Sequence, residues 1–580
     1  MISRRRIIAS TGALIGTSAV VAACGNNNNG QGTGTGPSAG SSGSAASASS
    51  GGGSPTADVN PGGIANLEQQ AAFEYLDPQQ IYVNNSSAFA RLIYRTLMAW
   101  KEDPATGKYE LVPDLAADMP TNADGGKTWT FKLKPGIKYM DGTAITAADL
   151  KYGVERSMDP QISNGPQYAK QYLLGADKYT GPTKGPLASI EAPDATTITF
   201  KLAQPVGYWD QLCTMYTFTP VPRAKDTGAK YDLSPVTMGP YKFQQYDKQS
   251  KIVLVKDTNW TADTDPLRTQ NFQQIVCLMG LDLTRIDNDL IQDTNGGTNV
   301  MFSDDPAPAA INRVTQEPLK SRTLTGSTIF IDYVAVQQNQ PALKKPEVRQ
   351  AILYALNPKA SIQALGGPLV RVPIQSFAPP TLKGFEDIKD RFDIGEDGKP
   401  DKAKQLLQQA GVSNLTLTFA HPNTPVWTKV AQTIVAALAR AGIKVVPKPI
   451  EASAYYKTVS TLSNKYDLLR GGWGYDIPDG STIYPPIFQG GANLYNGTSN
   501  LAQLNDPHVN DLIKQALAKP STEAALPLWQ ELDKYIVEQA LVIPRFLYKI
   551  APIMGSKVKG AYISPVLGNT DVSNAYISKT

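Results

Sequence analysis

Histidine and cysteine are nearly absent from this chain of 580 residues, which has two histidines and three cysteines. The histidines, His421 and His508, stand far apart, and no Cys-x-x-Cys pair occurs. Zinc and haem sites depend on these side chains, and a nucleophilic enzyme needs a base beside its nucleophile. We therefore expect no metal site, no cofactor, no catalytic residues and no enzyme activity.

A strong excess of one charge is also missing. The formal net charge is +4, and three of the positive charges are Arg4, Arg5 and Arg6. Taking these three from the 55 lysines and arginines leaves 52 basic residues against 51 acidic ones. The body of the protein thus lacks the basic surface that nucleic acid requires, and we expect a small or neutral partner. The length indicates two or three domains.

The one long apolar run lies near the N-terminus, at residues 7–23, and polar residues and glycines interrupt it. It follows the arginines and ends in Val-Ala-Ala-Cys, which resembles the lipobox of bacterial lipoproteins, whereas the Arg pair resembles a twin-arginine signal. We expect residues 1–24 to be a signal peptide, with Cys24 lipidated. The protein would then be exported and anchored to the outer face of the cytoplasmic membrane.

Residues 25–57 contain no charge and no aromatic side chain. Such a Gly/Ser/Asn-rich segment has almost nothing to bury and predicts a flexible linker between the anchor and the body. The other two cysteines, Cys213 and Cys277, leave two alternatives open: a disulfide, or two buried thiols.

The body alternates predicted strands and helices. Residues 128–133 and 196–202 alternate apolar and polar side chains as half-buried strands do, and residues 238–260 read as a hairpin that turns at 247–250. Thr146 and Asp149 have the spacing of a capping box and predict a helix start.

The second half predicts a βαβ unit. A helix is expected from about Pro346, and another with Asp401 as N-cap and Gly411 at its C-terminus. They precede a strand at 415–420, a helix at 426–441, a strand at 443–447 and a last strand at 466–473. The fold class is therefore α/β with parallel pairing.

The stretch Arg-Gly-Gly-Trp-Gly-Tyr-Asp, residues 470–476, stands where that last strand ends. Ligands bind beyond the carboxyl ends of strands in open α/β sheets. Gly472 and Gly474 could expose their backbone to an extended ligand, Trp473 could form an apolar wall, and Asp476 could hold a cation. The alternative is a glycine-rich surface turn.

Several stretches together resemble the family 5 solute-binding proteins of ATP-binding-cassette (ABC) importers, the oligopeptide and dipeptide group. They are the segment from "LVPDLAADMP" through "TWTFKLKPGIKYMDGTAITAADL", then "MGPYKF", "PEVRQAILYALN", "KAKQLLQQAG" and "GGWGYD". The resemblance implies two α/β lobes joined by a hinge, as in periplasmic binding proteins, with an extra subdomain in the first lobe. We expect lobe I at 58–95, 190–325 and 546–580, the extra subdomain at 96–189, and lobe II at 326–545.

The resemblance also implies site residues. In peptide-binding members, an Asp three residues after a Trp receives the peptide's α-amino group, which matches Asp476 and Trp473, while Gly472 and Gly474 match positions that pair with the peptide backbone. Tyr475 is larger than the family's usual residue and would narrow the site. The Leu-Asp-Pro loop at 76–85 resembles the opposite wall, with Asn84 as a contact.

The function implied is capture of peptides by a monomer and their delivery to a membrane permease with its ATPase. Family members also take sugars, nickel complexes and other solutes, so another small solute is the first alternative. A surface signalling or adhesion lipoprotein of the same fold is the second, and an exported hydrolase is disfavoured by the scarcity of histidine.

Overall fold

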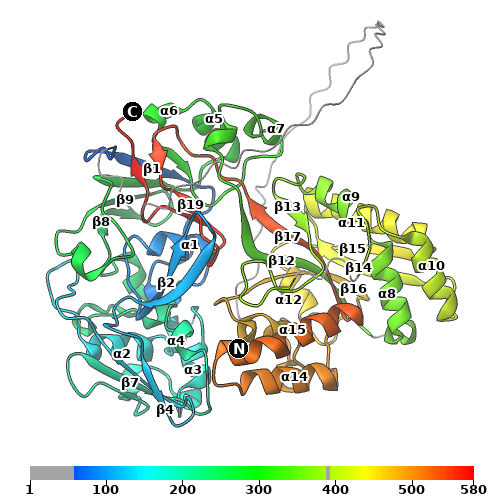
Figure 1. Cartoon of the computed structure of the whole chain (residues 1–580), viewed down its shortest axis with the longest axis horizontal. Helices are drawn as coiled ribbons and strands as arrows, with labels where there is room; N and C mark the ends of the chain where they lie inside the picture. Colours follow the sequence, from blue (N-terminus) through cyan, green and yellow to red (C-terminus); the bar gives the residue numbers. More distant parts are fainter. Residues whose placement is uncertain (1–57, 163, 339, 387–391) are drawn as a thin grey trace, which may run out of the picture.

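The structure is a computed structural model that describes residues 58–386 and 392–580, apart from residues 163 and 339. The predicted signal peptide (1–24), linker (25–57) and lipidated Cys24 lie outside the described residues. Figure 1 shows two bodies side by side, with the first half of the chain mostly in the left one and residues from about 326 to 545 in the right one.

A five-stranded sheet forms the upper part of the left body (Figure 1). Its order is β11 (Asn299–Met301), β1 (Ile64–Glu68), β10 (Gln274–Leu278), β9 (Lys251–Lys256) and β8 (Tyr241–Asp247). β1 runs parallel to β10 and β11, whereas β8 and β9 form the predicted hairpin. Helices α1 (Asn84–Ala90), α5 (Leu283–Ile291), α6 (Thr294–Gly297) and α7 (Ile311–Val314) accompany it.

A four-stranded antiparallel sheet forms the lower part of the left body. Its order is β4 (Thr121–Ala123), β5 (Thr128–Lys132), β7 (Thr197–Lys201) and β6 (Ile190–Glu191). Beside it lie the hairpin of β2 (Met98–Asp103) and β3 (Lys108–Pro113) and the helices α2 (Ala147–Arg156), α3 (Tyr168–Tyr172) and α4 (Trp209–Leu212). The strands at 128–133 and 196–202 are confirmed, as is the capping box of Thr146 and Asp149 on α2.

The right body is built on a six-stranded mixed sheet. Its order is β13 (Arg371–Pro373), β17 (Val542–Ile550), β12 (Gly326–Val336), β16 (Leu468–Gly474), β14 (Thr416–Pro422) and β15 (Lys444–Ile450). β14 and β15 run parallel and are joined by α11 (Pro425–Arg440), so the predicted βαβ unit is confirmed. The other helices are α8 (Pro346–Ala355), α9 (Pro358–Ala364), α10 (Pro400–Gln409), α12 (Tyr455–Val459), α13 (Tyr484–Phe488), α14 (Pro507–Leu517) and α15 (Thr522–Glu538).

The start of α10 corrects one prediction. Lys399, not Asp401, is the N-cap residue, because Pro400 supplies the fixed φ of the first helical position and begins the helix earlier. Asp401 lies in the first turn, where its charge favours the helix dipole. Gly411 follows the helix with φ of 64°, as the C-terminal glycine should.

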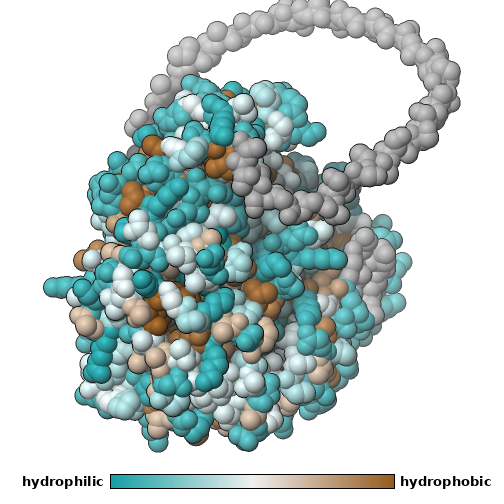
Figure 2. Space-filling view, turned by 60° about the vertical axis from the view of Figure 1, so that its left-hand side comes forward, coloured by the Kyte–Doolittle hydropathy of each residue, from teal (hydrophilic) through white to brown (hydrophobic). Residues whose placement is uncertain are grey.

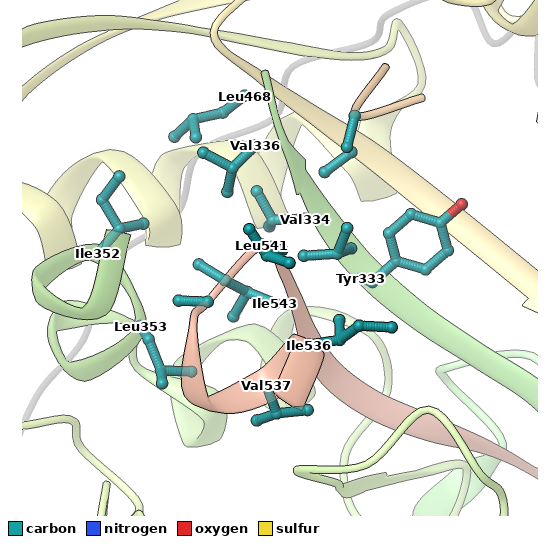
Figure 3. Packing of buried hydrophobic residues seen from close by; sticks show 14 of the residues in the cluster. Tyr333, Val334, Val336, Ile352, Leu353, Leu468, Ile536, Val537, Leu541 and Ile543 are labelled. Carbon is teal, nitrogen blue, oxygen red and sulfur yellow. The ribbon is translucent and has the colours of Figure 1, made fainter. Parts of the chain in front are cut away.

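The core of the six-stranded sheet is continuous because its central strand is covered on both faces. β12 is buried along nearly its whole length, and Figure 3 shows Val334 and Val336 packed with Ile352 of α8, Ile536 of α15 and Ile543 of β17. Each such aliphatic side chain contributes about 1.5–3 kcal/mol when fully buried. The mixed α/β fold class is thus confirmed.

Two further clusters form separate cores around the five-stranded and four-stranded sheets. Cys277 belongs to the first and Cys213 to the second, and both are unpaired, buried thiols. Of the two alternatives, two buried thiols are therefore confirmed and the disulfide is wrong. The chain joins the two bodies through one paired segment, in which Thr323 lies opposite Ile553 and Gly326 opposite Ile550. On the face in Figure 2, hydrophobic atoms form small separate patches in a mostly hydrophilic surface.

Candidate functional site

β16 has one edge that lacks a neighbouring strand for part of its length. β12 accompanies it antiparallel as far as Gly474, whereas β14 pairs with it only at Leu468 and Leu469. Among the described residues, no strand therefore lies along the other edge from Gly471 to Gly474. Such an edge offers backbone donors and acceptors to an added strand.

Two glycines of β16, Gly471 and Gly474, are required by the protein's own aromatic rings. A Cβ on Gly471 would lie 2.1 Å from the Tyr333 ring, and one on Gly474 would lie 2.5 Å from the Phe330 ring. The whole strand is buried, so the alternative of a glycine-rich surface turn is wrong. In this conformation, the atoms that come close to the backbone of Gly471 and Gly474 belong to side chains of the neighbouring strand β12.

Arg470 fixes the beginning of the glycine-rich stretch. Its Nε donates to Asp332 of β12 at 2.8 Å, and its guanidinium lies 4.2 Å from the centre of the Trp427 ring. Arg545 of β17 donates from its own Nε to the same carboxylate at 2.7 Å. Because three adjacent strands share this buried carboxylate, β16 is held as a rigid support for the residues that follow it.

Trp473 lies in the core rather than at an open surface. It is 2% exposed, and its Nε1 donates to the carbonyl of Thr482 at 3.1 Å. The Thr482 hydroxyl in turn accepts the backbone N–H of Asp476 at 3.1 Å. These bonds close the turn after β16 and set the direction of the Asp476 side chain. Contact of Trp473, Gly472 or Gly474 with a ligand stays a prediction.

Asp476 connects the right body to the left one. Its Oδ2 accepts the hydroxyl of Tyr82 at 2.7 Å and that of Tyr168 at 2.5 Å. Tyr82 precedes α1, and Tyr168 begins α3, so the two phenols come from different parts of the left body. Asp476 as a whole is 7% exposed, so its carboxylate lies at a closed boundary between the bodies.

Burial keeps the Tyr168 phenol protonated, so it acts as a donor. The pKa of Tyr168 is raised well above its ordinary value, first by burial and then by the charge of Asp476. Burial also raises the pKa of Tyr172, one turn further along α3, to about 12. The Tyr168 and Tyr172 rings stack with their centres 6.3 Å apart, which orients Tyr168 toward the carboxylate.

The neighbours of Asp476 also cross the boundary. The Tyr475 hydroxyl donates to the carbonyl of Pro565 in the left body at 2.9 Å and lies 3.1 Å from the Thr381 hydroxyl in its own body, and its side chain is fully buried. Ile477 packs into the core of the four-stranded sheet. Tyr475 thus links the two bodies directly through Pro565, and its narrowing of a ligand site stays a prediction.

The loop at 76–85 does meet Asp476, but through a residue that sequence reasoning missed. Asn84 donates from its side-chain nitrogen to the carbonyl of Leu567 at 2.9 Å, within the left body, whereas Tyr82 reaches the carboxylate. A ligand contact of Asn84 stays a prediction. The signal for Tyr168 was its pairing with Tyr172 at i and i+4 on one face of a short helix.

Within the described ranges, no helix combines the length and apolar character needed to cross a membrane. In the same part of the chain, no three acidic, histidine or cysteine side chains gather as metal ligands would. A buried carboxylate between two bodies, beside the bare edge of a strand, is an arrangement for enclosing a ligand. The described residues therefore form two bodies that meet at the buried Asp476 carboxylate.

The sequence profile of the bacterial extracellular solute-binding proteins, family 5 (middle region), matches residues 110–495. The chain belongs to this family, and it is accordingly an extracellular binding protein and not an enzyme. Among curated relatives, the oligopeptide-binding protein OppA of Bacillus subtilis (strain 168) is 24% identical over 516 residues, which are 85% of this chain and 89% of the relative. The glutathione-binding protein GsiB of Escherichia coli (strain K12) is 24% identical over 511 residues, 86% and 91% of the two chains.

Solved structures agree on the fold. The clavulanic acid biosynthesis oligopeptide binding protein 2 superimposes with a TM-score of 0.82 at 29% identity, covering 90% of this chain and 97% of that one. The periplasmic binding protein DppA from Helicobacter pylori, in complex with the peptide STSA, gives a TM-score of 0.67 at 22% identity, covering 90% and 99%.

Proposed function

We propose that this protein is the substrate-binding lipoprotein of an ABC importer and captures peptides between its two lobes. The observation that carries the proposal is the Asp476 carboxylate, which is buried at the boundary of the lobes beside the unaccompanied edge of β16. A buried carboxylate is costly without a donor or cation, and a peptide brings an ammonium group to the start of an extended backbone.

In this proposal the α-ammonium of the peptide binds Asp476, and the peptide backbone pairs with Gly472 and Gly474. Trp473 and Tyr475 hold the floor of the site, and Asn84 lies on the opposite wall. The names of the relatives, which are binding proteins for oligopeptides and glutathione, support a peptide over the other solutes expected for the family, sugars and metal complexes.

Ligand entry requires the lobes to separate. The hydroxyls of Tyr82 and Tyr168 occupy the carboxylate in the closed form, so an incoming ammonium group must displace or join them. The paired segment around Gly326 and Ile550 is the natural hinge, because it is where the chain passes between the bodies. The ligand would then displace the hydroxyls of Tyr82 and Tyr168 from Asp476 in the same step in which the lobes close over it.

The division of the chain is part of the proposal: lobe I at 58–95, 190–325 and 546–580, an extra subdomain at 96–189, and lobe II at 326–545. The separate cores support it, and the third core, which extends to Phe218, supports a later end for the extra subdomain. The N-terminal sequence supports cleavage before Cys24, lipidation of that residue, and a linker of 33 residues that spans roughly 30 Å.

Two experiments test the function. Mass spectrometry of the ligand released on unfolding the purified protein should find peptides. A sugar or a metal complex would contradict the proposal that the ligand is a peptide. A permease and ATPase from the same cell, reconstituted in vesicles, should hydrolyse ATP faster when this protein and its ligand are added together. Binding without any stimulation would favour the surface signalling lipoprotein.

A further inference from the structure

A cavity opens beside the carboxylate of Asp476, on the side of α3. Its empty volume is about 860 Å³, part of it open to solvent, and both lobes contribute to its wall. Tyr82, Tyr168 and Tyr172 line it from lobe I and the extra subdomain, and Gln489 and Asn493 line it from lobe II. The cavity would therefore close over the same ligand that Asp476 holds.

The lining is mostly polar and carries no charge. It consists of four tyrosines, three glutamines, one asparagine, three serine or threonine residues, two prolines and one leucine, and none of these described residues carries a charge. Amides and hydroxyls both donate and accept hydrogen bonds, and tyrosine rings add flat apolar surface. Such a wall can satisfy a neutral polar or aromatic group, but it offers no counter-charge.

Two residues both line the cavity and donate hydrogen bonds to the Asp476 carboxylate. Tyr82 and Tyr168 line the cavity, and their hydroxyls donate to Asp476 at 2.7 and 2.5 Å. These two shared residues place the cavity next to the carboxylate that would hold the ammonium group.

We infer that this cavity is the subsite for the side chain of the peptide's first residue, and that it selects uncharged side chains such as those of glutamine, asparagine and tyrosine against acidic ones. The inference rests on the proposed function. An acidic side chain meets no cation here, and the carboxylate of Asp476 behind the tyrosines repels it. A basic side chain is less disfavoured, because that carboxylate attracts it.

The sharpest test compares two tripeptides that differ only in charge. In calorimetry at pH 7.5, Gln-Ala-Ala should bind the unaltered protein about 10- to 100-fold more tightly than Glu-Ala-Ala. Equal affinities, or a preference for Glu-Ala-Ala, would overturn the subsite while leaving peptide binding intact. Failure of every tripeptide to bind would overturn the inference together with the proposed function.

A charge added to the wall provides a second readout. Gln171 lines the cavity from α3 and is exposed, so Gln171→Lys should keep the fold and improve binding of Glu-Ala-Ala relative to Gln-Ala-Ala by about tenfold. The matched control is Gln161→Lys, which adds the same charge on the same subdomain at an exposed position outside the cavity lining. An equal change in both variants would mean that only the overall charge matters, and the subsite would be wrong.

Discussion

Replacing Gly207 by alanine tests whether the closed contact between the lobes limits ligand binding. Gly207 lies between β7 and α4, and it faces Pro520, which lies in the turn between α14 and α15 on the other lobe. A Cβ at this position would lie 2.4 Å from the carbonyl carbon of Pro520 and 2.7 Å from the carbonyl oxygen of Lys519. Carbon atoms in contact need about 3.5 Å, so the lobes would have to separate there by about 1 Å.

The cost of this separation falls on the closed form alone. Overpacking of this size costs about 1–3 kcal/mol, which corresponds to roughly 5- to 150-fold weaker binding when the ligand requires closure. The same opening would lengthen the bonds from Tyr82 and Tyr168 to Asp476, which lie on the same boundary. The melting temperature should change little, because the clash is relieved by moving the lobes apart and not by unfolding either of them.

Calorimetry with Gln-Ala-Ala, and small-angle scattering of the ligand-free protein, measure the two consequences. Gly207→Ala should bind more weakly and have a larger radius of gyration than the parent. Gly62→Ala is the matched control, because a Cβ there meets its nearest atom at an ordinary 3.7 Å. Parental affinity in Gly207→Ala, or a loss of stability as large as the loss of affinity, would refute the idea that this contact belongs to a movable boundary.

Three further predictions concern the anchor, the thiols and one buried acid. Cys24→Ser should be released from the membrane fraction, and retention there would contradict lipidation. In that variant Cys213 and Cys277 should resist a thiol reagent until the protein unfolds, because both are buried and burial raises their pKa values; rapid labelling in native buffer would contradict this. Burial raises the pKa of Asp533 from 3.8 to about 6, so the folded state holds this proton more tightly than the unfolded state. The stability that this bound proton contributes is present below pH 4 and is lost as the pH rises through 6. The free energy of unfolding falls by up to about 3 kcal/mol over this range. In chemical denaturation, Asp533→Asn should therefore gain stability relative to the parent between pH 4 and pH 7. If the difference in stability between variant and parent does not change with pH, burial of Asp533 does not raise its pKa as described.

The local elements followed from the sequence because their signals are local. Alternation predicted β5 and β7, the Thr146–Asp149 spacing predicted the start of α2, and the order strand, helix, strand predicted the parallel pair of β14 and β15. The one helix start that failed, at Asp401, failed because two adjacent signals competed and Pro400 prevailed.

The surroundings of Asp476 could not be predicted in the same way. Tyr82 is 394 residues from Asp476 in the sequence, and Tyr168 is 308, so their meeting depends on how the two bodies close. The reason for Gly471 and Gly474 was equally remote, since the rings of Tyr333 and Phe330 come from the neighbouring strand. Sequence patterns indicated the carboxylate and its strand, whereas the partners across the boundary required the tertiary structure.

The role of Asp476 as the receptor for the peptide's ammonium group is tested most directly by calorimetry on four combinations. The parent and Asp476→Asn are each titrated with Gln-Ala-Ala and with its N-acetylated form. Asparagine can still accept the hydroxyls of Tyr82 and Tyr168, so the variant removes the charge while retaining the acceptor. Loss of a charge-assisted contact in a closed site is worth on the order of 2–5 kcal/mol, or roughly 30- to several-thousand-fold in affinity. We predict that either change alone causes a loss of this size and that the second change adds little, because both remove the same pair. Two independent losses that add in full would mean that Asp476 does not hold the amino terminus, and the proposed binding mode would be wrong.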